Sequence, residues 1–545
     1  MDKPSAGDMH THASIVAKDW IYVDGGEVSY EFGTSIPEFV TLGIPLSTNW
    51  TNSTLTMTST TRPTAAQPHD FQTLWLDKSN VIYCFGGQIW FDTAAAANFS
   101  TPEDSIWAFT PDRTGSGNWT EALGPAGSAP FPQGIFRPAE GASASDGNKG
   151  YYLAGYVTSD TSPEIHLLGG QTRPSPGLLT FDYSSMTITN TSDGGYFASQ
   201  YADSNATVAG VMIDVPPFGE DGVLIVMGGQ SGLFDNLTIY DKRNQLWYSQ
   251  TAGGDIPTAR GLFCATGVQG GDSSSYEIFM HGGIQNNFQG TANSGGDEIF
   301  ILTLPAFQWV QVNYTSVSPR AYHTCHAAGN SQMVIVGGID GTASFGTLFN
   351  GSADPWPQAI GVFDMSALEW KDSYEANAAP YVPAPVIESF YGSNAGKYPP
   401  QWTSPAVEQL FHPTPNTTVP TSSSTPIPSP TPAAHQLSHG AIAGMVIGCI
   451  GVVILPWSVI AFFLWRRRQH QKLALPPKDG IFIGSPTHPR KLQGFYAAEM
   501  EGSYQPRPLE KSHSWELSTG DVAWEMERTT RVFKPAIPPE PVELG

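Results

Sequence analysis

The sequence predicts an all-β folded part made of repeated four-stranded units, and three observations lead to this prediction. A short run of apolar and β-branched residues that ends in a glycine pair recurs along the chain. Two further strand-like runs follow each pair, and a tryptophan stands near the start of the last run. β-branched and aromatic residues favour strands, and recurrence of one pattern indicates a tandem array of one supersecondary unit.

The run with its glycine pair marks five units, and a sixth copy of the run carries Ala154 before Gly155; IHLLGGQ at 165–171 is interpreted as an insertion in the third unit. The glycines concerned are Gly25, Gly26, Gly86, Gly87, Gly155, Gly228, Gly229, Gly282, Gly283, Gly337 and Gly338. Successive copies are 61, 68, 74, 54 and 55 residues apart. We expect each pair to form a sharp turn between the second and third strands of its unit, where a positive φ and the lack of a Cβ are useful.

Other residues mark the first and last strands of each unit. Tryptophans stand at the expected start of the fourth strand, at Trp50, Trp119, Trp247, Trp309 and Trp370. Arginines introduce the first strand in three units, at Arg137, Arg260 and Arg320. Each unit therefore has four predicted strands, and the large tryptophan side chains are suited to packing one unit on its neighbour.

With these glycine pairs, tryptophans and arginines, the chain resembles the kelch family of β-propellers from residue ~10 to residue ~390. The resemblance implies a six-bladed propeller whose ring closes, because a single four-stranded blade cannot bury both of its faces. Combined with the segments that follow, the chain resembles the type I kelch-repeat membrane proteins predicted in filamentous fungi. Most members of that group have no assigned biochemistry, so the resemblance implies an architecture more than an activity.

Four regions are expected along the chain. Residues 1–400 form the propeller, which is the ectodomain, and residues 401–439 form a disordered stalk rich in Ser, Thr and Pro, a composition that cannot build a packed core. Residues 440–465 form a transmembrane helix. Residues 466–545 form a disordered, proline-rich cytoplasmic tail.

The predicted transmembrane helix rests on residues 441–465, which carry no charge. A bilayer core requires about 20 apolar residues in a helix, whereas a buried globular helix, the alternative, rarely runs so long without a polar position. Arg466-Arg467-Arg468 follow directly, and by the positive-inside rule they place the C-terminal side in the cytoplasm. We therefore expect a single-pass type I protein of the plasma membrane or secretory pathway.

Glycosylation sequons support the same orientation. They begin at Asn49, Asn52, Asn98, Asn118, Asn190, Asn205, Asn236, Asn313, Asn350 and Asn416, and all precede the predicted span. Such sequons mark potential N-glycosylation of an exported surface. The first 20 residues have no apolar signal-peptide core, so we expect the natural start, with its signal, to lie upstream.

Two features bear on partners. The segment before residue 440 holds 14 Lys+Arg against 39 Asp+Glu, and this acidity argues against nucleic acid, which requires a basic surface. Gly440, Gly444 and Gly448 share one face of the predicted transmembrane helix. Small residues at this spacing permit close helix approach, so a homodimer through the span is a further hypothesis.

The pair Tyr322-His323 raises the question of an enzyme. Galactose oxidase and other copper radical oxidases share this propeller class and use two tyrosines, two histidines and a cysteine bonded to one tyrosine. Tyr322-His323 resembles their Tyr-His ligand pair, but Leu262 stands where the radical tyrosine is expected. His281 and His326 are interpreted as isolated, so we expect core histidines rather than copper ligands.

The cysteines Cys264 and Cys325 follow Arg260 and Arg320 on the first strands of adjacent predicted blades. Such strands converge near the axis, so a Cys264–Cys325 disulfide is expected in an oxidising compartment, the alternative being two buried thiols. Cys84, between Tyr83 and Phe85, is expected to be a buried apolar residue.

The sequence contains no motif that predicts a catalytic residue, a metal site or a cofactor. We therefore expect a non-enzymatic cell-surface protein that binds a glycan or a protein through propeller loops, where binding residues concentrate. Two alternatives stay open. One is a membrane-tethered copper radical oxidase, and the other is a surface scaffold that acts through its cytoplasmic tail.

Overall fold

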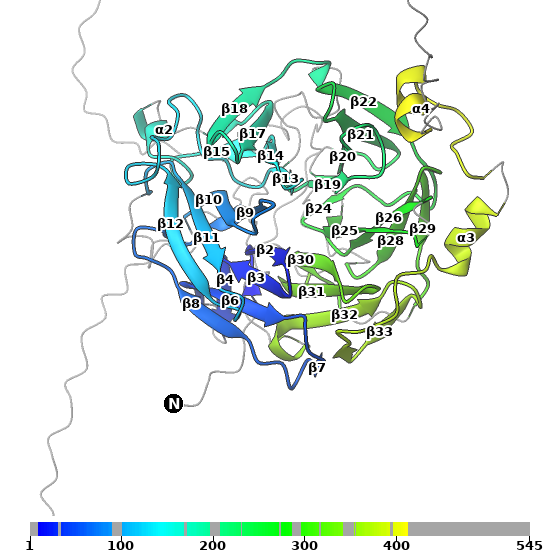
Figure 1. Cartoon of the computed structure of the whole chain (residues 1–545), viewed down its shortest axis with the longest axis horizontal. Helices are drawn as coiled ribbons and strands as arrows, with labels where there is room; N and C mark the ends of the chain where they lie inside the picture. Colours follow the sequence, from blue (N-terminus) through cyan, green and yellow to red (C-terminus); the bar gives the residue numbers. More distant parts are fainter. Residues whose placement is uncertain are drawn as a thin grey trace, which may run out of the picture. The chain divides into compact units, whose positions relative to one another are not determined.

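The computed structural model describes residues 9–30, 34–89, 101–167, 172–196, 208–229, 232–271, 274–285, 296–314, 318–341, 354, 356–392 and 396–412, which all belong to one compact unit. Nearly all regular structure in these ranges is β-strand, which confirms the all-β prediction (Figure 1). The predicted transmembrane helix with Gly440, Gly444 and Gly448, the tail and most of the stalk lie outside them. Among the described residues, no helix has the length and apolar character needed to cross a bilayer.

Most of the described strands form antiparallel sets of four, and each set comes from one continuous stretch of sequence. Sheets 1 to 3 contain β2 (Ala13–Ala17), β3 (Trp20–Asp24), β6 (Val40–Pro45) and β8 (Thr58–Thr61); β9 (Asp70–Leu76), β10 (Ile82–Gln88), β11 (Ile106–Pro111) and β12 (Gly117–Leu123); and β13 (Ala142–Ser145), β14 (Lys149–Leu153), β17 (Leu178–Asp182) and β18 (Thr187–Thr191).

Sheets 4 to 6 follow the same order. They contain β19 (Val211–Val215), β20 (Val223–Met227), β21 (Asn236–Asp241) and β22 (Leu246–Thr251); β25 (Cys264–Gln269), β26 (Tyr276–His281), β28 (Ile299–Leu304) and β29 (Gln308–Gln311); and β30 (Ala321–Ala328), β31 (Gln332–Ile339), β32 (Ile360–Asp364) and β33 (Glu369–Lys371). A short strand before sheet 5, β23 (Gly253–Gly254), pairs in parallel with β29 and so links sheets 4 and 5.

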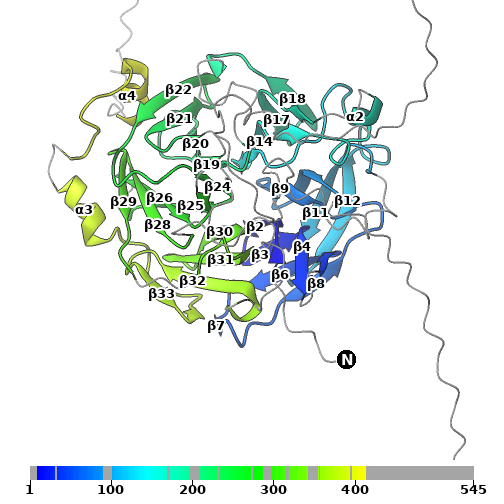
Figure 2. The same ribbon diagram turned by 180° about the vertical axis from the view of Figure 1, so that it is seen from behind.

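The sheets stand in a closed ring with their first strands at the centre (Figures 1 and 2). The first strands β2, β9, β13, β19, β25 and β30 contact one another in turn, and β30 contacts β2 again. Sheets 1 and 6 therefore meet directly, without exchanging a strand. The fourth strands lie at the outer edge of the ring (Figure 1).

Along the second strand of a sheet, successive apolar side chains point to opposite faces, which explains why the sheets stack face to face. In β31, Met333 and Ile335 belong to the core shared with sheet 5, whereas Val334 and Val336 belong to the core shared with sheet 1. All four side chains are fully buried. Because successive side chains of a strand point to opposite faces, a continuous apolar run buries both faces of a sheet at once. An apolar core of this kind lies between each pair of neighbouring sheets.

Short strands reinforce the ring at its connections. They are β1 (Met9–His10), β4 (Glu27–Tyr30) and β5 (Thr34–Pro37); β15 (Tyr156–Val157) and β16 (Arg173–Pro174); β24 (Arg260–Gly261) and β27 (Ile284–Gln285); and β7 (Trp50–Thr51) and β34 (Ser373–Tyr374). The pair β7–β34 joins sheet 1 to the segment after sheet 6.

The assignment of Trp50 to a fourth strand was wrong. The fourth strand of sheet 1 is β8, and Trp50 lies in β7, where its ring stacks on Tyr374 with centroids 4.9 Å apart. Its indole N–H donates to the carbonyl oxygen of Pro45 at 2.7 Å. Trp50 therefore helps to hold the two ends of the ring together. The other four tryptophans lie in fourth strands, as expected.

The glycine pairs all have positive φ, but two of them, Gly86-Gly87 and Gly337-Gly338, lie inside strands and not in the predicted sharp turns. All eleven predicted glycines have φ between 64° and 99°. Gly86-Gly87 nevertheless lie inside β10, and the third strand begins only at Ile106. A Cβ on Gly87 would lie 2.6 Å from the carbonyl oxygen of Asp70 in its own first strand. The Gly87 N–H donates to Pro138 of the next sheet at 2.8 Å, so the pair fits closely between two first strands.

One helix, α4, extends the folded unit beyond the predicted boundary at residue 400. Besides α2 (Glu164–Leu167) and the short 3-10 helix η4 (Pro357–Ala359), the structure contains α3 (Pro385–Tyr391) and α4 (Pro405–Phe411). Ser404 caps α4, and Val407 and Phe411 are fully buried in the core between sheets 4 and 5. Apolar residues at i and i+4 give a short helix one buried face. The predicted stalk therefore cannot begin at residue 401.

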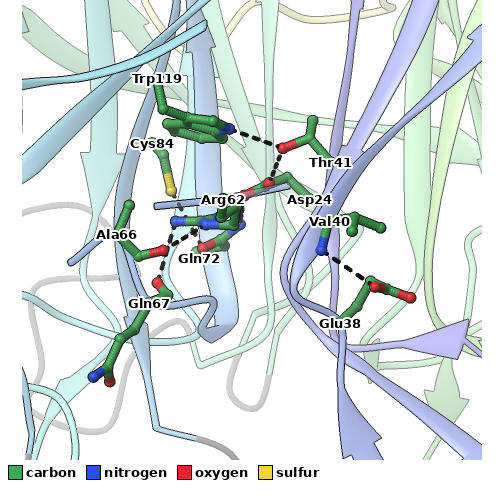
Figure 3. A network of polar contacts seen from close by, with 10 residues as sticks. All are labelled: Asp24, Glu38, Val40, Thr41, Arg62, Ala66, Gln67, Gln72, Cys84 and Trp119. Carbon is green, nitrogen blue, oxygen red and sulfur yellow. Dashed lines mark hydrogen bonds and ion pairs between the residues drawn. The ribbon is translucent and has the colours of Figure 1, made fainter. Parts of the chain in front are cut away.

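A buried ion pair of sheet 1 lies against sheet 2 (Figure 3). Arg62 forms the pair with Asp24, and their side chains are 2% and 1% exposed. The Arg62 guanidinium also donates to the Ala66 carbonyl oxygen at 2.7 Å and lies 4.5 Å from the centre of the Trp119 ring. Gln72 donates to Asp24 at 2.6 Å. Each charge is compensated by a partner, as a buried ion must be.

Replacing Arg62 by Leu should lower the free energy of unfolding by about 3–5 kcal/mol, because Asp24 would stay buried without its cation. Urea unfolding measures the loss. The control is Arg243→Leu, whose ion pairs with Glu220 and Asp221 are half-exposed, and we expect a cost below about 1 kcal/mol there. Equal losses in the two variants would contradict this role of Arg62.

Candidate functional site

The ring axis is lined by one residue of each sheet that has a left-handed backbone. These residues are Thr11, Phe71, Glu140, Ala209, Leu262 and Tyr322, with φ between 56° and 62°. Backbone hydrogen bonds of 2.7–3.3 Å run between these residues from sheet to sheet. With the N–H donor named first, they are Phe71 to Thr11, Ala209 to Glu140, Leu262 to Ala209, Tyr322 to Leu262 and Thr11 to Tyr322. The bond from Thr11 to Tyr322 joins the first sheet to the last. Residues other than glycine adopt a positive φ only where surrounding contacts offset its conformational free-energy cost.

The axial residues next to Tyr322 do not supply the ligands that a copper radical centre would need. Leu262 and Tyr322 occupy equivalent positions of sheets 5 and 6, so Leu262 stands where the radical tyrosine would be needed. Phe71 lies against Tyr322, with ring centroids 5.9 Å apart. Burial raises the pKa of Tyr322 well above its usual range and keeps the phenol protonated. The residues present do not fit the ligand set of a copper radical oxidase.

His281 was wrongly interpreted as isolated. Its Nδ1 lies 3.1 Å from Nε2 of His323, and both imidazoles are buried between sheets 5 and 6. His326, the other histidine considered, has its Nε2 2.7 Å from the Ser14 hydroxyl of sheet 1. Burial lowers the pKa of His281 to about 3, and the charges of Arg320 and Arg260 act in the same direction. The pair is therefore neutral at physiological pH.

The two cysteines singled out from the sequence meet on adjacent inner strands. Cys264 of β25 and Cys325 of β30 form a disulfide, with their Cα atoms 5.7 Å apart. Cys264 stands directly opposite His281 in the β25–β26 register. One ligand atom from each of Cys264, His281 and His323 falls within 4.8 Å of the others. Cys84 is a buried thiol that donates to Gln72 at 3.2 Å.

The sequons that lie in described residues differ in accessibility. Asn49, Asn118, Asn190 and Asn313 are exposed, whereas Asn52 and Asn236 are half-buried. The Asn52 amide donates to the Ile360 carbonyl oxygen at 2.8 Å, so attachment of a glycan there would break a bond between sheets 1 and 6. Asn98, Asn205, Asn350 and Asn416 lie outside the described residues. Asn118 and Asn190 lie on the outer strands β12 and β18, which directs any glycan to the rim of the ring.

A pocket of about 330 Å³ lies between hairpin turns of sheets 1 and 2. Lys18 and Asp19 from the β2–β3 turn, Ser79 and Asn80 from the β9–β10 turn, Arg113 from the β11–β12 turn, and Trp20 and Tyr22 of β3 are among its lining residues. Trp20 is half-buried, and the charged residues of the turns are exposed. Tight turns bring these side chains together because adjacent hairpins of two stacked sheets end on the same face of the ring.

Tyr22 gives this pocket a polar group without a partner. The residue is 1% exposed, and its hydroxyl has no hydrogen-bond partner among the described residues. Burial, with a contribution from Asp112, raises the pKa of Tyr22 to about 12, so the group remains a neutral donor. A buried hydroxyl without a partner costs stability, which a ligand could recover. Sequence analysis missed this site because it depends on turns that are about 60 and 95 residues apart.

A larger groove of about 710 Å³ runs between the outer strands of sheets 5 and 6. Val310, Tyr314, Trp370 and Val386 line it, together with Asn313. Asn313 is an exposed sequon residue, and a glycan there would occupy the groove. The smaller pocket between the turns is for this reason the better candidate for ligand binding.

The ring of four-stranded antiparallel sheets and the comparison with known sequences together support a propeller protein of the kelch-repeat kind. The chain is similar to a kelch repeat-containing protein from Arthroderma benhamiae, with 27% identity over 537 residues that cover 87% of this chain and 77% of the relative. No model of a known protein family matches. Among solved structures, that of YjhT aligns with a TM-score of 0.43 and 12% identity, over 67% of this chain and 97% of YjhT.

Buried histidines should make stability fall in acid. Burial lowers the pKa of His10, His12 and His281 to about 3 and that of His326 to about 4, from the usual 6.5. Above about pH 6.5 these histidines are neutral in both the folded and the unfolded chain, so they contribute nothing to the pH dependence of stability. Below it, the unfolded chain binds protons that the folded chain excludes, so each histidine removes up to about 1.4 kcal/mol per pH unit until its folded pKa is reached.

Urea unfolding between pH 7.5 and pH 5 measures this slope. The variant His326→Gln keeps a group able to bond Ser14 but removes one titrating site, so its slope should be shallower by the equivalent of about one proton. A free energy of unfolding that stays constant from pH 7 to pH 5 would contradict the neutral state of these histidines.

Proposed function

We propose that the six sheets are the blades of a six-bladed kelch-type propeller, and that this unit is the non-enzymatic, ligand-binding ectodomain of a cell-surface protein. The uncharged segment 441–465 and the arginines after it support a single membrane span. The sequons on one side of that segment support an exported, N-glycosylated unit on the outside. Among the described residues, Leu262 stands at the axial position where a radical tyrosine would be needed, which supports a non-enzymatic role.

The observation that carries the binding function is the pocket between the turns of sheets 1 and 2, with the unpartnered Tyr22 hydroxyl in its wall. Its volume lies at the lower end of the range typical of small-molecule sites. A protein partner would instead need a surface of about 800 Å². The pocket therefore favours a small ligand, or the terminal unit of a chain such as a glycan, over a protein surface.

The chemistry of the pocket favours a neutral sugar. The Trp20 ring supplies a flat apolar face, and Asp19, Asn80 and Arg113 supply acceptors and donors that hydroxyl groups can match. Lys18 and Arg113 are balanced by Asp19 and the neighbouring Asp112, so the local charge selects neither an anion nor a cation. A small polyhydroxylated ligand uses both properties of such a wall.

Replacing Tyr22 by Phe should weaken glycan binding by about tenfold, the effect of one lost hydrogen bond of about 1.4 kcal/mol. The stability of the free protein should not fall, because the hydroxyl has no partner there. The full chain, wild type and variant, would be screened on a glycan array, and the hits titrated by calorimetry.

The matched control is Tyr83→Phe, which removes a hydroxyl at the equivalent position of sheet 2, outside the pocket. It should leave glycan affinity unchanged. Arg243→Asn provides a second control, because Arg243 lies in the turn of sheet 4 that corresponds to the turn of Arg113. The proposal fails if no glycan binds, or if Tyr83→Phe weakens binding as much as Tyr22→Phe.

A further inference from the structure

The triad Cys264, His281 and His323 is an enclosed set of metal-ligand side chains between sheets 5 and 6. The three residues are 5%, 0% and 6% exposed, respectively. They come from three strands, β25, β26 and β30, which the closed ring brings together. Thiolate and imidazole are the donors that Zn²⁺ and Cu⁺ prefer.

The spacing of the two imidazoles suits one metal ion. His281 Nδ1 and His323 Nε2 are 3.1 Å apart. Two nitrogens bound to one tetrahedral ion at about 2.0–2.1 Å lie about 3.3 Å from each other, so only a small adjustment is required. The outer nitrogens, His281 Nε2 and His323 Nδ1, have no hydrogen-bond partner among the described residues. A histidine pair that only stabilised the core would be expected to have these atoms bonded.

The surroundings tolerate a bound cation. Trp356 and Trp370 lie beside His281, with ring centroids 6.4 and 5.4 Å away, and His281 is fully buried. Two arginines are near, but Arg260 pairs with Glu298 at 2.8 Å, and Arg320 Nη1 donates to Asp354 at 3.0 Å. These carboxylates offset the charges that would otherwise repel a metal ion.

In the structure the third ligand, Cys264, is engaged by Cys325. We propose that Cys264, His281 and His323 bind a Zn²⁺ or Cu⁺ ion when the Cys264–Cys325 disulfide is open, so that metal and disulfide compete for one sulfur. This is a site separate from the proposed ligand pocket. It is also distinct from a copper radical centre, because Tyr322 packs on Phe71 at the axis and contributes no ligand.

The exchange balances with a dithiol as reductant. One thiolate of the dithiol attacks Cys325 Sγ, the Cys264–Cys325 bond breaks, and Cys264 leaves as a thiolate. The second thiol of the reductant then closes on the first, which releases Cys325 as a thiol and oxidises the dithiol to a disulfide. Two electrons pass to the protein. The metal ion then binds the Cys264 thiolate, which would otherwise take up a proton. In a newly made chain both cysteines begin as thiols, so no reductant is needed there.

Two serine variants of the full chain separate the metal site from the disulfide. Cys325→Ser and Cys264→Ser both abolish the disulfide, but only Cys325→Ser leaves the ligand thiol free. With Co²⁺ as probe, Cys325→Ser should bind about one equivalent without reductant and show a thiolate-to-cobalt charge-transfer band. Cys264→Ser should show no such band. Adding His281→Phe to Cys325→Ser should weaken binding by about 100-fold or more.

Oxidised wild type should show no band, and wild type treated with a dithiol should show one. Displacement of Co²⁺ by Zn²⁺ or Cu⁺, but not by Mg²⁺, supports the assigned class of ion. Equal bands in the two serine variants, or no band in Cys325→Ser, would overturn the proposal. If either variant lacks the cooperative thermal transition of the wild type, the metal-site proposal is tested with the reduced wild type. The absence of a charge-transfer band in that sample would also overturn the proposal.

Discussion

The structure depends on one constraint, which is that each sheet has two apolar faces. In β31 alternate side chains enter the cores shared with sheet 5 and with sheet 1, and none of Met333, Val334, Ile335 and Val336 is exposed. A sheet of this kind cannot be stable alone, nor can an open stack, whose end sheets would each leave an apolar face in water. A closed ring is the arrangement that removes both ends.

Closure brings the first strands close together near the axis. Backbone groups, more than side chains, form the hydrogen bonds between them there. Left-handed residues bond from one first strand to the next, and the glycine pairs donate to the following sheet because no Cβ intervenes. Phe71, Leu262 and Tyr322 lie at the axis, and the two proposed polar sites lie elsewhere. One is the pocket at the turns of sheets 1 and 2, and the other is the interface between sheets 5 and 6.

The differences between the sequence predictions and the structure have definite physical causes. The glycine pairs were assigned to turns because a positive φ is usual there, but the same φ serves the close approach of neighbouring first strands. Trp50 was assigned by analogy with later tryptophans, yet it stacks on Tyr374, more than 300 residues away. The proline-rich segment after residue 400 concealed α4, since a two-turn helix is stabilised by the core it covers and not by its composition.

The sequence by itself determined the all-β class and the recurrence of one unit along the chain, because periodicity and glycine placement are local properties. The Cys264–Cys325 pairing was expected from the sequence, but only the tertiary structure decided which other side chains meet. Cys264 faces His281 through strand register, His323 arrives from the neighbouring sheet, and Tyr22 is joined in its pocket by residues of two later turns. These contacts follow from the stacking of the sheets and the closure of the ring. Both bring together residues that are far apart in the chain, so the contacts cannot be recognised from sequence periodicity.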